Sequence, residues 1–215
     1  MIIDASYFTG SIFIPQIGDG ASSIANNDNK LQQAIDQYEA EILVKALGRK
    51  LTKEFLSNIN PATKVLVNGA DAKWSNLLNG HDYVKNGDDF YWRGLIDTTG
   101  ILKESLIAYY IYYNYVREGQ TVMTTMGAKK GNSQNTTDAN ATSKLVNAWR
   151  SLHKWYSGEN YGCYNVSEYK GHIVEDYFGN DNSKDVSLYQ FMTDNSEDYT
   201  GWSFTALDNK NEFGI

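Results

Sequence analysis

The stretch that decides the fold is residues 31–48, LQQAIDQYEAEILVKALG. Its apolar side chains recur every three or four residues, which places them in one stripe along an α-helix. The stripe consists of Leu31, Ala34, Ile35, Tyr38, Ile42 and Ala46. Asp28 or Asn29 can cap the start of this helix, and Gly48 can end it. The pattern therefore predicts an amphipathic helix over residues 30–47.

The same spacing predicts three further helices downstream. Leu51, Phe55 and Ile59 share one face of a short helix that Pro61 ends. Residues 99–117 and residues 138–156 form two longer helices, the second with Asp138 as its cap. Between residues 61 and 100 the signals are mixed, and the turn sequence Asn86-Gly87 favours a hairpin or a loop with one helical turn.

Tyrosine is concentrated in the helix predicted over residues 99–117. Its tyrosines, at positions 109, 110, 112, 113 and 115, cover almost the whole circumference. A helix with one solvated face does not need so many aromatic side chains. We therefore expect part of this surface, including Tyr109, Tyr112, Tyr113 and Tyr115, to meet another subunit or the chain's own arm.

The remaining segments are rich in Gly, Ser, Asn, Asp and Thr. Residues 119–137 carry Val122, Met123 and Met126 in their first half and the pair Lys129-Lys130 in their second. This loop is too long for a simple connection between helices, and loops of that size inside a compact domain are usually functional or disordered. Residues 1–28 are predicted to form an N-terminal arm and residues 159–215 a C-terminal extension that packs on a neighbour, around a helical core at 29–158.

Charge and composition narrow the function. The formal net charge is -7 and the sequence pI about 4.9, which argues against binding nucleic acid through phosphate neutralisation and favours protein partners. The 16 Tyr and 5 Trp residues suit surfaces that become buried on assembly, and they equally suit a glycan-binding module or an ordinary core. Cys163 is the only cysteine, so no intrachain disulfide forms. No window has the roughly 20 apolar residues of a membrane span, and the start of the chain lacks a signal-peptide pattern.

The residue types of a catalytic or cofactor site do not come together in the sequence. His81, His153 and His172 lack metal-ligand spacing, and residues 181–192 depart from a calcium loop at Val186 and Met192. No glycine loop has the spacing of a phosphate or dinucleotide site. Acidic neighbours such as Glu39 with Glu41 are the candidates for hydrolysis, but a small helical core is a poor source of a deep cleft. We expect no enzyme activity, no metal and no cofactor.

The first helix also carries a resemblance to a known family. Residues 31–48, with a Tyr-Glu centre running into Leu47-Gly48, resemble a pattern in small head-completion proteins of tailed phages, especially crAss-like phages and others with Bacteroides-type hosts. The similarity continues in Trp92-Arg93-Gly94-Leu95, in residues 112–117 and in residues 121–127, and it covers roughly residues 30–156. The segments 1–28 and 159–215 show no such resemblance.

This resemblance implies a head-to-tail connector, a small antiparallel helical bundle with a long loop and extended arms. Such subunits form a ring around the portal, typically of twelve copies, and extend the DNA channel toward the tail. The implied partners are further copies of the chain, the portal protein and neighbouring neck or tail proteins, with DNA only as passing cargo and no membrane. The implied location is the neck of the virion, after synthesis in the host bacterial cytoplasm.

Two functional alternatives remain open at this stage. The first is a tail-terminator or neck protein that joins the tail tube. The second is a surface glycan-binding module, which the Tyr, Trp and Asn content favours. The residues expected at a subunit or portal interface are Tyr109, Tyr112, Tyr113, Tyr115, Val122, Met123, Met126, Lys129 and Lys130.

Overall fold

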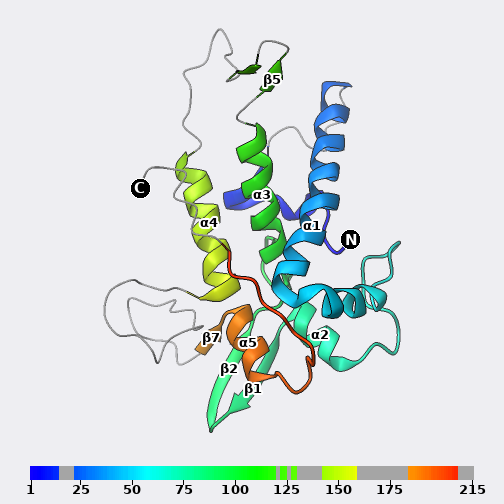
Figure 1. The fold of residues 1–215 in the computed structure, drawn as a ribbon, viewed down its shortest axis with the longest axis vertical. Coiled ribbons are helices and arrows are strands. Elements are labelled where there is room, and N and C mark those ends of the chain that lie inside the picture. Colours follow the sequence, from blue (N-terminus) through cyan, green and yellow to red (C-terminus); the bar gives the residue numbers. More distant parts are fainter. Residues whose placement is uncertain (15–21, 120–121, 125–126, 130–141, 159–183, 208–215) are drawn as a thin grey trace.

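The computed structural model describes residues 1–14, 22–119, 122–124, 127–129, 142–158 and 184–207. These residues form two layers (Figure 1). The helical layer consists of the first part of α1 (Ser22–Ser57), α3 (Leu106–Gly119) and α4 (Thr142–Ser157). The mixed layer consists of α2 (Ala72–Asn79), β1 (His81–Lys85), β2 (Asp88–Trp92), β7 (Lys184–Val186) and α5 (Leu188–Asp194).

The helix α1 confirms the periodicity of the opening stretch. Leu31, Ile35 and Ile42 of the predicted stripe are buried, and α3 packs against this face. Gly48 has non-helical dihedral angles (φ 78°, ψ 158°), so α1 kinks there before continuing to Ser57. The two predicted helices are therefore one long helix with a sharp bend, and its second part runs toward α2 (Figure 1).

The central helix α3 packs between α1 and α4, and all its residues from Leu106 to Asn114 are buried. It begins later than the predicted Thr99 because the preceding residues pair as strands. β3 (Ile96–Asp97) and β4 (Glu104–Ser105) form a short antiparallel ladder. The Ser105 hydroxyl oxygen then accepts hydrogen bonds from the backbone N–H groups of Ile107 and Ala108 at 3.1 and 3.4 Å, which caps α3.

The hairpin predicted from Asn86-Gly87 is present in the mixed layer. β1 pairs antiparallel with β2 from His81↔Trp92 to Lys85↔Asp88, and both turn residues have the positive φ that a two-residue hairpin turn requires. β7 pairs with β2 in parallel, so the sheet order is β1-β2-β7. A strand from the C-terminal third of the chain thus completes a sheet begun by residues 81–92.

The described parts of both terminal segments pack on the chain's own core. Residues 1–14 contain two 3-10 helices, η1 (Ala5–Tyr7) and η2 (Gly10–Ile12), and Ile2, Ile3 and Phe8 are buried. Residues 195–207 cross both layers, and the backbone N–H of Thr205 donates to the Lys45 carbonyl oxygen at 2.8 Å (Figure 1). Residues 1–14 and 184–207 are thus part of the folded core, while packing of the C-terminal extension on a neighbour stays a prediction. The predicted boundary at residue 28 also falls inside α1.

The fold is mainly helical but mixed, with 55% of the described residues in helices and 12% in strands. A plain antiparallel helical bundle does not describe it, because a three-stranded sheet and α5 occupy one layer. None of the helices within the described residues is long and apolar enough to cross a membrane.

Candidate functional site

The tyrosines predicted at an interface lie on α3. Tyr109, Tyr112 and Tyr113 are only 8%, 4% and 1% exposed, and Tyr115 is partly buried. The chain itself covers them: the Tyr109 hydroxyl lies 3.3 Å from the Ser11 hydroxyl, and the Tyr113 ring packs on Trp149 with ring centres 4.3 Å apart. The arm thus covers part of the surface, while an interface role for these tyrosines stays a prediction.

The other predicted interface residues follow α3. Val122 and Met123 lie on β5 (Val122–Thr124), and Lys129 lies on β6 (Gly127–Lys129). The two strands pair antiparallel, with Val122 opposite Lys129, so part of the predicted loop is a hairpin. It extends beyond the end of α3 (Figure 1). Met126 and Lys130 fall outside the described residues.

Buried and partly buried aromatic rings donate hydrogen bonds from their polar atoms to the chain's own backbone. The indole N–H groups of Trp92, Trp155 and Trp202 donate to the carbonyl oxygens of Leu77, Gly94 and Ala46 at 3.1, 3.0 and 2.8 Å. The hydroxyls of Tyr156 and Tyr199 donate to Thr205 and Lys73 carbonyl oxygens, each at 2.7 Å. A buried polar atom needs such a partner. Much of the aromatic content is thus explained by the fold of one chain.

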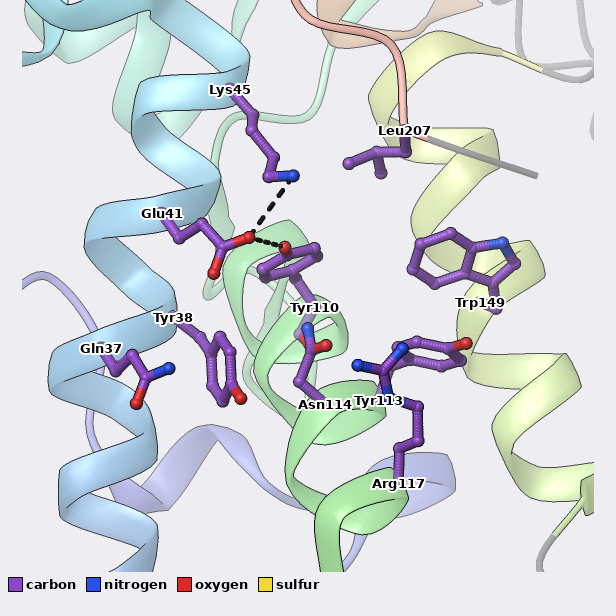
Figure 2. Close-up of a pocket in the computed structure, with 10 residues that line it drawn as sticks. All are labelled: Gln37, Tyr38, Glu41, Lys45, Tyr110, Tyr113, Asn114, Arg117, Trp149 and Leu207. Atoms are coloured by element: carbon purple, nitrogen blue, oxygen red, sulfur yellow. Dashed lines mark hydrogen bonds and ion pairs between the residues drawn. The ribbon is translucent and has the colours of Figure 1, made fainter. Parts of the chain in front are cut away.

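A polar cleft opens between α1, α3 and α4, and its volume is about 270 Å³. Figure 2 shows that side chains from all three helices point into it, with Leu207 of the C-terminal segment at one end. Its lining consists of Gln37, Tyr38, Glu41, Lys45, Tyr110, Tyr113, Asn114, Arg117, Trp149 and Leu207. Sequence reasoning missed this cleft because its walls come from residues more than a hundred positions apart.

A hydrogen-bonded network holds the α1 and α3 walls of the cleft together. The Glu41 carboxylate accepts the Tyr110 hydroxyl at 2.7 Å and pairs with the Lys45 ammonium at 3.4 Å (Figure 2). The Tyr38 hydroxyl donates to Glu118, and burial together with this bond raises the pKa of Tyr38 to about 12. Burial and the bond to Glu41 also raise the pKa of Tyr110. Both phenols are therefore neutral donors at neutral pH.

Glu39 and Glu41, the carboxylate pair considered for hydrolysis, have different roles. Glu41 faces the cleft, whereas Glu39 is 3% exposed on the opposite side of α1. The Glu39 carboxylate accepts the backbone N–H of Ile2 at 2.8 and 2.9 Å and that of Ile3 at 3.1 Å. Glu39 thus holds the N-terminal segment on the core, which is a structural use of its charge.

The Trp92-Arg93-Gly94-Leu95 sequence forms the junction between the layers. Trp92 and Leu95 are fully buried. The Arg93 guanidinium pairs with Glu104 at 2.7 Å and with Asp97 at 3.1 Å, and it lies 4.5 Å from the centre of the Trp155 ring. These contacts explain the motif by packing and charge within the subunit.

No group of three or more His, Cys, Asp or Glu side chains could hold a metal ion in the part of the chain that the structure describes. His81 stacks on Tyr83 in β1, and His153 lies on α4 against Trp149. His172 and Cys163 lie outside the described residues.

Comparisons with protein-family models, curated proteins and solved structures find no match to this chain. A functional proposal therefore depends on its own residues and geometry.

Proposed function

We propose that this protein is a non-enzymatic structural subunit of the neck of a tailed phage, which forms a ring between portal and tail and extends the DNA channel. The observation that carries the proposal is the exposure of large apolar side chains on two separate segments. Ile101 and Leu102 are 105% and 49% exposed in the connection before α3, and Val65 and Val67 are 58% and 37% exposed in the connection before α2.

Two apolar surfaces on one subunit suit a ring. A head-to-tail ring joins two different faces of each copy, and closure of the ring covers both of them. Leu102 lies against η2, since a Cβ on Gly10 would lie 3.1 Å from Leu102 Cδ1, and Phe13, which is 58% exposed, directly follows η2. The second surface adjoins the N-terminal segment, where the Lys64 ammonium donates to the Ile3 carbonyl oxygen at 3.1 Å. Exposed apolar groups of this kind favour burial against a partner.

The net charge and the β5–β6 hairpin are consistent with the same proposal. A subunit with a net charge of -7 presents a surface that repels DNA, so a duplex can pass without binding. The hairpin β5–β6 and the partly buried Tyr115 would meet the portal or an adjacent copy. The proposed location is the neck of the virion, with about twelve copies by the family resemblance. A tail-terminator ring on the tail tube would use the same two faces.

The test is the molar mass of the full chain by light scattering over a range of concentrations, with negative-stain images of large species. Wild-type protein should form rings, alone or on addition of the portal protein. The double variant Ile101→Asp, Leu102→Ser should remain monomeric. The control is Val84→Asp, at a 69% exposed position of the β1–β2 hairpin, and it should assemble as the wild type does.

Two outcomes would contradict the proposal. One is a chain that remains monomeric with and without the portal protein. The other is a ring that forms equally well with the double variant, since the apolar surface would then have no part in assembly.

A further inference from the structure

The cleft between α1, α3 and α4 is lined by charged, amide and aromatic side chains that the proposed ring does not use. Glu41 and Lys45 line one wall, Asn114 and Arg117 line the second, and Trp149 lines the third (Figure 2). A helix interface that only needed stability would be filled by apolar side chains at native density. Among the described residues a space of about 270 Å³ remains here, lined by charged and amide groups.

The polar groups offer acceptors and donors on neighbouring atoms. Glu41 uses one carboxylate oxygen, Oε1, for both Tyr110 and Lys45, so Oε2 takes no part in those two contacts. The Asn114 amide nitrogen donates to the Tyr110 carbonyl oxygen at 2.9 Å, so the amide oxygen of Asn114 is not used in that bond. Carboxylate, amide and ammonium groups around one space can bind adjacent hydroxyls, because each hydroxyl both donates and accepts.

The third wall is aromatic. Trp149 is partly buried on α4, and its ring packs against the Tyr113 ring at 4.3 Å and against His153 at 4.9 Å between ring centres. A ring fixed in this way offers a rigid apolar face at little cost in conformational entropy. Leu207 adds an apolar contact at one end of the cleft.

The size of the cleft limits the ligand. Sites for drug-sized molecules span roughly 300–1,000 Å³, and this cleft is just below that range. A small, hydroxyl-rich ring with one apolar face matches both the volume and the two kinds of wall.

We propose that this cleft binds one pyranose residue of a glycan, with the C–H face of the sugar on Trp149 and adjacent hydroxyls on Glu41, Lys45 and Asn114. The site goes beyond the ring function and does not depend on it. A ring of such subunits would carry one sugar site per copy.

The test uses the full chain and a panel of methyl pyranosides: those of glucose, galactose, mannose, N-acetylglucosamine and glucuronic acid. Saturation-transfer NMR measures which sugars bind and which sugar protons lie on the protein. At least one sugar should bind, and the protons of one ring face should receive the strongest transfer. The indole N–H resonance of Trp149, identified by its loss in Trp149→Phe, should shift on titration.

Matched variants locate the binding. Lys45→Gln should weaken binding about tenfold, the effect of a lost charge-assisted hydrogen bond. Lys53→Gln, at an exposed position of the same helix, should bind as the wild type does. Thermal unfolding of each variant checks that the fold persists. Failure of every sugar to bind, or binding that Lys45→Gln and Trp149→Phe leave unchanged, would overturn the proposal. Because binding is measured per chain, this result does not depend on whether rings form.

Discussion

The helical layer and the mixed layer are held together in different ways. In the helical layer, side chains at regular spacing meet across helices, and polar side chains such as Glu39 and Glu41 connect the segments. In the mixed layer, the backbone itself comes into close contact at Gly80 and Gly94. A Cβ on Gly94 would lie 2.6 Å from both the Gly80 nitrogen and the Leu78 carbonyl oxygen. The first kind of packing tolerates small changes of shape, while the second leaves no room for one methyl group.

The largest effect should come from Gly94→Ala. Gly94 has φ 93°, and its added Cβ would overlap backbone atoms that cannot move aside. We expect a loss of about 3 kcal/mol or more in the free energy of unfolding. The control is Gly87→Ala, because Gly87 has a similar φ of 86° but no atom of the described residues lies within 4 Å of its Cβ position. That variant should lose only about 1–2 kcal/mol.

Chemical denaturation followed by circular dichroism measures both variants. The difference between them isolates the backbone contact from the strain of a positive φ. Equal losses in the two variants would mean that Gly94 is needed for its dihedral angles alone, and the contrast between the layers would then disappear.

The difference between regularly spaced helix contacts and individual close contacts also explains which parts of the fold the sequence could predict. Periodicity located α1, its break at Gly48, and most of α3 and α4, because a helical stripe is a local pattern. The hairpin followed from Asn86-Gly87, whose turn type is also local. The start of α3 was misplaced, because Ile96–Asp97 pairs with Glu104–Ser105 and this pairing overrides helix propensity.

The packing of residues 184–207 was not predictable by these means. Tyr199 and Trp202 pack as individual residues without a periodic pattern. The Tyr199 hydroxyl and the Trp202 indole N–H each donate to a distant backbone carbonyl oxygen. Such contacts need no repeat in the sequence, so the segment looked like an arm. The cleft was hidden for a related reason, because Glu41, Asn114 and Trp149 become neighbours only when three helices assemble. Glu41 could be picked out as a charged residue near an apolar stripe, but its partners could not.

A smaller effect is expected in the helical layer from Glu39→Gln. The carboxylate of Glu39 accepts the backbone N–H groups of Ile2 and Ile3, and an amide can accept with only one of its two terminal atoms. We expect the free energy of unfolding to fall by about 2 kcal/mol, the range of hydrogen bonds to a charged group. Denaturation at neutral pH measures the loss.

The matched control is Glu54→Gln, which removes an exposed carboxylate from the second part of the same helix. Its stability should stay within about 0.5 kcal/mol of the wild type. If Glu39→Gln were equally neutral, the N-terminal segment would have to be held by its buried apolar side chains alone.

The smallest effect should be a change in pH dependence at His153, also in the helical layer. Its Nε2 atom is buried and makes no hydrogen bond among the described residues, and burial lowers the pKa of His153 below its ordinary value of 6.5. Between the lowered pKa and 6.5 the unfolded chain binds more protons than the folded chain, so this contribution to stability rises with pH across that window. It is complete above 6.5 and lost as the pH falls toward the lowered value.

His153→Phe keeps an aromatic contact with Trp149 and removes the titrating group, so its stability should fall less than that of the wild type between pH 7 and pH 5. At pH 7.5 the variant should be at least as stable, since it no longer buries a nitrogen without a partner. A pH profile parallel to that of the wild type would show that His153 is already solvated in the folded chain, and the helical layer would then be more open beside the cleft than its contacts indicate.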